Sequence, residues 1–407
     1  MYFLSEAKAI EDDIVELRHR LHRHPELGTE LPWTREQVLK ELTGIDLEIT
    51  LPEGDSSIFA VLRGGAADPD LSRRPVVLLR ADMDALPLHE MVESDFKSEI
   101  DGLMHACGHD LHTATLVGAV KLLDARRAEL KGDIVFLFQT AEETLTGARN
   151  AIAAGVLDVA GKRVDRAYGA HVFSGMMPHS TFQTRKGPIM AAADGLFFDI
   201  VGKGGHGSMP EKGADPVAAM AEIISGLQVL VTRRFTAFRP VVVNVGVAQA
   251  GDASNIIPES CHVEASIRTS TPEDRALAEE VFTTYVTKVA EAHRCEARIN
   301  YLHGVAPAVC DDDAAEFALE VLTDMFGAER VPEMQLPLSG SEDFAEIMAE
   351  VPGAFICYSG TPRGEDYTQW GSNHSATCWF DDIVIPEAVA MYAELGFRQC
   401  EELAGTL

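Results

Sequence analysis

The sequence has no uninterrupted apolar run long enough to span a bilayer, and it has few basic residues for its length. Lys and Arg total 34, against 64 Asp and Glu, so the formal charge is −30 at pH 7. Nucleic acid and anionic lipid repel such a chain, and we expect neither nucleic acid nor a membrane as a partner. An anionic substrate would need a local positive pocket.

Cysteine is also scarce. The seven cysteines are an odd number and follow no disulfide-framework spacing, which is typical of reduced thiols in the cytoplasm. Residues 1–10 lack a basic segment followed by an apolar one, so we expect no secretory signal peptide. Together these features predict a cytoplasmic protein.

The length of 407 residues exceeds what one hydrophobic core usually serves, and 46% hydrophobic residues supply ample core material. After Gly187 the pattern changes to predicted strands and two long helices with few metal-ligand residue types. We therefore predict two domains of α/β and α+β type. Residues 1–187 and 301–407 would form a catalytic domain, with 188–300 inserted as a separate domain.

Between Met104 and His112 the sequence reads M-H-A-C-G-H-D-L-H, in which several residues can bind a metal or move a proton. They are His105, Cys107, His109, Asp110 and His112. A thiolate and an imidazole two residues apart suit zinc or a similar first-row ion better than calcium or magnesium. The apolar run 114–120 predicts a buried helix behind them. The alternative is a helix start with surface histidines and a buried cysteine.

Residues that can bind metal or move protons follow three other apolar segments. They are Asp82 and Asp84 after 75–80, Glu142 and Glu143 after 133–138, and His171 near 168–172. Strand ends of this kind form the ligand crevices of α/β sheets. Adjacent acids point in different directions, so one can hold a metal while its neighbour handles a proton. Taken singly, the aspartates could simply solvate a strand end and His171 could be a core histidine.

Two further motifs allow more than one interpretation. The basic run 18–24 lies in a predicted helix over 5–24, and a solvated helix face is favoured over a phosphate-binding patch. The loop 202–210 contains G-x-G-x-x-G, but Pro210 and Gly213 prevent the helix that a dinucleotide site requires. This glycine loop can instead bring His206 close to a bound ligand.

Together these fragments resemble the metallo-aminoacylases of the M20 peptidase clan, in the branch of hippurate hydrolases and auxin-conjugate amidohydrolases. The resemblance runs from about Glu16 to His374. It is carried by Asp82 to Pro87, Met104 to His112, Phe138 to Glu143, His171, Gly204 to Pro210, Asn255 to Pro258 and Ser341 to Phe344.

The resemblance implies an α/β, mixed-sheet, zinc-peptidase-like catalytic domain with an inserted α+β lid and dimerisation domain. It also implies two divalent metal ions per subunit, with zinc preferred over manganese or cobalt. The implied metal ligands are Cys107, His109, Glu143, His171 and His374. Glu142 matches the general base, and Asp84 matches the carboxylate that supports the metal site.

In the lid, His206 matches a histidine that reaches the active site of the partner subunit, which implies a homodimer, or a dimer of dimers. Asn255 and Arg268 match positions that contact substrate. A basic residue there would hold a substrate carboxylate against the negative charge of the chain.

The expected activity is hydrolysis of the amide bond of an N-acyl amino acid, with a metal-activated water and Glu142 as base. A dipeptidase or carboxypeptidase of the same clan is one alternative, and a metal-binding protein without catalysis is another. The chain departs from the family pattern at Thr140, at Ala376 and over 173–180. Because these positions adjoin the cleft, they bear on the choice of substrate.

Overall fold

The structure is a computed structural model that describes residues 3–406. Met1 and Tyr2, part of the stretch inspected for a signal peptide, and Leu407 lie outside the described residues. The chain forms two compact units. The first comprises Met1–Gly187, Cys310–Gln335 and Glu346–Leu407, and the second comprises Pro188–Val309 and Leu336–Ala345. No helix within 3–406 is long and apolar enough to cross a membrane.

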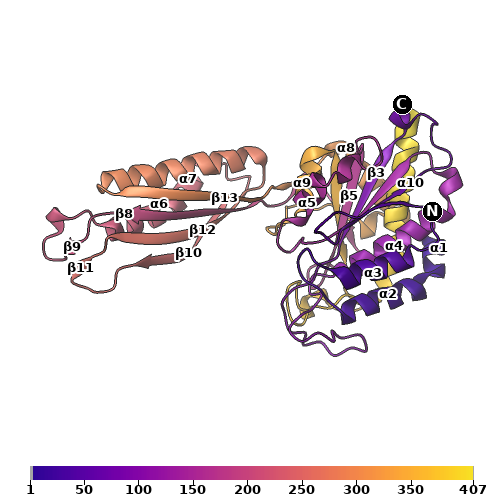
Figure 1. Cartoon of the computed structure of the whole chain (residues 1–407), viewed down its shortest axis with the longest axis horizontal. Helices are drawn as coiled ribbons and strands as arrows, with labels where there is room; N and C mark the ends of the chain where they lie inside the picture. The colour runs from indigo at the N-terminus through magenta and orange to yellow at the C-terminus, as the bar shows by residue number, and fades with distance from the viewer. Residues whose placement is uncertain (1–2, 407) are drawn as a thin grey trace. The chain divides into compact units, whose positions relative to one another are not determined.

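The first unit is built on a seven-stranded mixed sheet, which confirms the expected α/β class (Figure 1). In spatial order its strands are β1 (Glu48–Thr50), β2 (Ile58–Leu62), β4 (Asp133–Gln139), β3 (Val76–Asp82), β5 (Arg166–Phe173), β15 (Gly353–Ser359) and β6 (Phe182–Gln183). The central strands β4, β3, β5 and β15 are parallel. The apolar runs of β3, β4 and β15 are buried throughout, as expected for parallel strands covered on both faces.

Helix α4 (His109–Ala125) begins within the metal-ligand motif, at His109, and almost all of it is buried. It contacts β3 and also packs against α2 (Glu11–Arg23) and α10 (Ile385–Thr406). The helix begins after Gly108, whose φ of 82° is left-handed. A Cβ atom there would lie 2.3 Å from Val172, so glycine lets the start of α4 approach the end of β5. The other α-helices with described residues in this unit are α1 (Leu4–Ala9), α3 (Pro32–Glu41), α5 (Gly147–Ala153), α8 (Asp312–Phe326) and most of α9 (Phe344–Glu350).

The second unit is a four-stranded antiparallel sheet with two helices packed on one face (Figure 1). The strands run in the order β10 (Val242–Ala250), β12 (Ser260–Arg268), β8 (Ala193–Val201) and β13 (Glu296–Val305), and the helices are α6 (Pro216–Arg234) and α7 (Pro272–Ala292). Both helices begin with proline behind a capping side chain, Asp215 for α6 and Thr271 for α7. A separate ribbon joins β9 (Gly205–His206) to β11 (Ile256–Ile257).

Two sequence predictions differ from this description. The predicted boundary at residue 300 falls inside β13, because that strand pairs with β8 as far as Val305. The predicted solvated face of residues 18–24 is wrong for Arg18 and His22, which are 1% and 4% exposed. Arg18 and His22 lie on the side of α2 that packs against α4, and carboxylates there neutralise both cations.

Candidate metal centre

The ends of the parallel strands bring the predicted ligands of the first unit to one edge of the sheet. Asp82 ends β3 and pairs in register with Gln139, the last residue of β4. The register of β3 with β5 places His171 near the same end, since β5 continues to Phe173. Carboxyl ends of parallel strands form the usual ligand crevice of such sheets.

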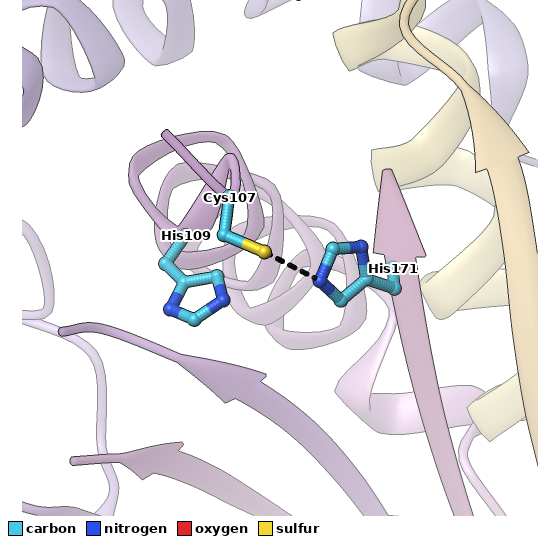
Figure 2. Close-up of side chains that lie close together, drawn as sticks. All are labelled: Cys107, His109 and His171. Atoms are coloured by element: carbon cyan, nitrogen blue, oxygen red, sulfur yellow. Dashed lines mark hydrogen bonds between the residues drawn. The ribbon is translucent and has the colours of Figure 1, made fainter. Parts of the chain in front are cut away.

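Cys107 lies among three imidazole rings. Its Sγ atom is 3.3 Å from Nε2 of His171 and 3.1 Å from Nε2 of His374. Figure 2 shows Cys107 and His109 at the start of α4, with the ring of His171 facing the sulfur from β5. Burial raises the pKa of the Cys107 thiol well above its usual range and lowers the pKa of His171. Without a cation, this environment therefore favours the neutral forms of both groups.

His109 and Glu143 carry buried polar atoms that lack hydrogen bonds. Neither ring nitrogen of His109 has a hydrogen-bond partner among the described residues, and nor does Oε1 of Glu143. Carboxylate oxygens surround the His109 ring, with Asp82 and Asp84 at 3.6 and 3.5 Å and Glu142 at 3.9 Å. Unpaired buried polar atoms are costly, so their convergence indicates a bound group.

Of the five groups of candidate metal-binding side chains among the described residues, two share Cys107. One group is Cys107, His109 and His171, and the other is Cys107, Glu143 and His374. Within each group the ligand atoms lie within 4.8 Å of one another. A thiolate, imidazoles and a carboxylate are the donors that zinc and similar first-row ions prefer. The residues present therefore fit two divalent ions.

Asp84 holds the turn that carries the two adjacent acids. Its carboxylate accepts the backbone N–H of Glu142 at 3.0 Å and that of Glu143 at 3.1 Å. Ala141, just before them, has a φ of 57°, which is strained for a residue with a Cβ. The turn leaves Glu143 3.4 Å from Nε2 of His374, and a carboxylate oxygen of each acid lies 3.9 Å from Nε2 of His109. Which of the two acids binds a metal and which moves a proton stays a prediction.

His374 has a similarly constrained backbone. Its φ is 64°, and its backbone N–H donates to the carbonyl oxygen of Ala106 at 2.9 Å. The preceding residue, Asn373, donates to the carbonyl of Val172 and accepts the N–H of Ser174. The loop therefore fixes His374 against both the motif before α4 and the end of β5.

A chain of buried polar residues lies behind the candidate ligands, and sequence reasoning missed its arginine, Arg80. Arg80 donates to Asp82 at 2.6 Å, and Asp82 accepts Nδ1–H of His112 at 2.6 Å. Nε2 of His112 accepts the backbone N–H of Val172, so this ring is neutral and bridges β3 to β5. Although burial alone would raise the pKa of Asp82, the charge of Arg80 holds it well below its usual range. Arg80 directly follows the apolar run Val76–Leu79, and a cation at the end of a buried strand indicates a nearby carboxylate partner, here Asp82.

Three predicted site residues lie in the second unit. His206 on β9 and Asn255 are close together, because Gly207 donates its N–H to the carbonyl of Asn255 at 2.9 Å. Ser208 donates its N–H to Nδ1 of His206, which places the ring proton on Nε2. Arg268 lies apart from them, at the end of β12. It lines a hollow of about 610 Å³ on the sheet, together with Asn244, Ser266, His303, Phe197 and Leu302.

The chain is similar in sequence and in fold to several known proteins. The model of peptidase family M20/M25/M40 matches residues 78–397. N-acetylcysteine deacetylase of Bacillus subtilis is 34% identical over 95% of this chain and 97% of its own length. The hippurate hydrolase of Campylobacter jejuni is 33% identical over 98% and 99%. The crystal structure of Bacillus subtilis YXEP, described as a dinuclear metal binding peptidase, has a TM-score of 0.82 and 31% identity, covering 97% of this chain and 99% of its own.

Proposed function

The chain belongs to peptidase family M20/M25/M40, and we propose that this hydrolase cleaves the amide bond of N-acyl amino acids. The products would be a carboxylic acid and a free amino acid. The proposal rests on one observation above all: an acid, Glu142, stands beside two donor groups that share Cys107. Relatives that act on N-acetylcysteine and hippurate, both N-acyl amino acids, support the same substrate class.

Two divalent ions would be held by the predicted ligands, with Cys107 common to both. The ligands are Cys107, His109, Glu143, His171 and His374. When bound, such ions lower the pKa of water and polarise a carbonyl oxygen. Zinc is the first choice because thiolate and imidazole dominate the donor set, with manganese or cobalt as alternatives.

Glu142 is proposed to take a proton from the attacking water and to return it to the leaving nitrogen. The neighbouring residue, Glu143, lies 3.4 Å from the proposed ligand His374, so we assign metal binding to Glu143 and proton transfer to Glu142. Asp84 contributes by holding the backbone of both acids in one turn. The buried position of Glu142, 5% exposed, keeps bulk water from this carboxylate.

The second unit is proposed to supply substrate contacts. His206 has its proton on Nε2 and is exposed, so it can donate a hydrogen bond to a developing oxyanion. We propose that it does so in the active site of a partner subunit, with the enzyme working as a homodimer or a dimer of dimers. Asn255 would contact the substrate from the same ribbon, and Arg268 would bind the carboxylate of its amino-acid part.

The compartment proposed is the cytoplasm. All seven cysteines lie in the described part of the chain and are buried free thiols. A reducing environment preserves such thiols, including the proposed ligand Cys107.

A small substrate panel tests the proposed reaction. We expect hydrolysis of N-acetyl, N-benzoyl and longer N-acyl amino acids, with loss of activity after chelation and recovery after zinc, manganese or cobalt is added back. Dipeptides of matched side chains form the comparison, because YXEP is described as a peptidase. Faster cleavage of dipeptides would favour a dipeptidase. Tight metal binding without cleavage of any amide would contradict the proposed reaction and favour a metal-binding protein without catalysis.

A further inference from the structure

Two buried cations of α2 bind a carboxylate next to a proposed metal ligand. Asp110, fully buried, follows His109 in the first turn of α4. Its Oδ2 accepts Nε–H of Arg18 at 3.0 Å and Nδ1–H of His22 at 2.9 Å. Hydrogen bonds between charged partners in a buried site are roughly twice as strong as neutral ones. They join two helices whose contacting residues are about 90 positions apart in sequence.

The same cations bind two other segments. Arg18 also donates to Asp382, which begins the short 3₁₀ helix Asp382–Val384, eight residues after His374. Nε2 of His22 lies 3.3 Å from Glu90, whose other oxygen accepts the N–H of Ser98. The two side chains therefore tie α2 to α4, to the segment around Glu90, and to the segment that follows His374.

The hydrogen bonds of His22 and Arg18 require a doubly protonated imidazole ring and a guanidinium group, respectively. Both nitrogens of His22 face carboxylates, so the ring is an imidazolium that donates twice. Arg18 uses Nε for Asp110 and Nη1 for Asp382, two nitrogens held apart in one plane, whereas the three donors of an ammonium share a single nitrogen. Neither residue is among the proposed ligands, and both are buried too deeply to bind substrate.

We propose that Arg18 and His22 are positioning residues of the metal centre, which act through Asp110 and Asp382 on the segments that carry its ligands. Asp110 fixes the start of α4 and so the placement of Cys107 and His109. Asp382 fixes the segment after His374, whose own N–H is bound to Ala106. This inference rests on the proposed metal centre, and it adds that the geometry of that centre is set from α2.

Cobalt binding tests this inference without an activity assay. The variants are Arg18→Lys, which keeps the charge but not the fork, and His22→Gln. Arg20→Gln is the matched control, because Arg20 lies on the same helix and pairs with Glu41 at 2.7 Å, and Glu41 in turn binds Lys121, about three turns along α4 from His109. The readouts are the Kd for cobalt(II), the thiolate-to-cobalt absorption of the saturated protein, and the Tm of the metal-free form.

We expect Arg18→Lys and His22→Gln to raise the Kd about 10- to 100-fold and to change the absorption spectrum. Arg20→Gln should leave both as in the wild type. If both variants lower only the Tm and bind cobalt with wild-type Kd and spectrum, their role is structural and the inference is wrong. If His22→Gln does not fold, the Kd and absorption spectrum of Arg18→Lys alone test the inference. A wild-type protein that binds no cobalt would contradict the proposed function itself.

Discussion

The Sγ atom of Cys107 lies 3.1 Å from Nε2 of His374, although 267 residues separate them in the sequence. The same sulfur is 3.3 Å from His171, so Cys107 belongs to both groups of candidate ligands. No other proposed ligand is common to these two groups. Under the proposed ligand assignment, both metal positions would depend on this one side chain, and this dependence can be measured.

Cys107→Ala should therefore lose both ions, whereas His171→Ala and His374→Ala should each weaken mainly one. The physical reason is that the histidines belong to one group each, while the sulfur belongs to both. Metal analysis after gel filtration gives the number of ions per chain. A Cys107→Ala protein that retains two ions would show that the thiol is not a ligand. Slower labelling of Cys107 by iodoacetamide in the metal-loaded wild type provides an independent check.

The stability contributed by His22 should depend on pH. Although burial would lower the pKa of His22, Asp110 and Glu90 raise it to about 9, from 6.5. A raised pKa means that this stabilisation is fully present below pH 6.5 and is lost as the pH rises through 9. The difference in unfolding free energy between wild type and His22→Gln should therefore shrink over that range.

Chemical denaturation at several pH values measures this difference. His89→Gln serves as the control, because the His89 side chain is 71% exposed and pairs with an exposed Asp101. A wild-type-to-His22→Gln difference that stays constant from pH 6 to pH 9.5 would mean that His22 is not held as an imidazolium.

Mixing two inactive variants tests whether His206 acts across a dimer. His206→Ala and Glu142→Gln, combined under conditions that allow subunit exchange, should regain roughly a quarter of wild-type activity. About half of the dimers would be mixed, and each mixed dimer would have one site with neither defect. If exchange is verified by mass and no activity returns, His206 does not serve the site of a partner subunit.

Arg268→Ala should raise the KM for N-acyl amino acids about tenfold to a hundredfold, with a smaller effect on kcat. The range corresponds to losing a hydrogen bond between charged groups, worth about 1.5–3 kcal/mol. The matched comparison is an N-acyl amino acid amide, which lacks the carboxylate and should be cleaved equally by both proteins. An equal KM increase for the acid and the amide would exclude carboxylate binding by Arg268.

Much of the fold could be predicted from the sequence where burial is uniform. The run Val76–Leu79 indicates a covered parallel strand, and β3 occupies Val76–Asp82. The extent of β13 is harder to predict from the sequence. This strand lies at the edge of its sheet, next to β8, and is largely exposed. Its extent is determined by pairing with a distant strand, which a local pattern does not contain.

The candidate site shows a similar division. Cys107 and Glu143 can be recognised as candidate ligands from the sequence, because residues of metal-ligand type repeatedly follow predicted strands or precede predicted helices. Arg18 and His22 do not, since a cation on an amphipathic helix is normally solvated and their partner Asp110 is about 90 residues away. In the sequence Asp110 is one of several motif residues, and the fold shows that its carboxylate binds Arg18 and His22 of α2.

The most direct test of the central claim is kcat and metal content in Glu142→Gln, measured on one N-acyl amino acid. We predict that both ions remain, because Glu142 is not among the proposed ligands, and that kcat falls by a factor on the order of 10²–10⁴, the usual contribution of a general acid–base. Near-wild-type activity, or loss of both ions together with activity, would contradict the account of Glu142 as the base beside a two-metal centre.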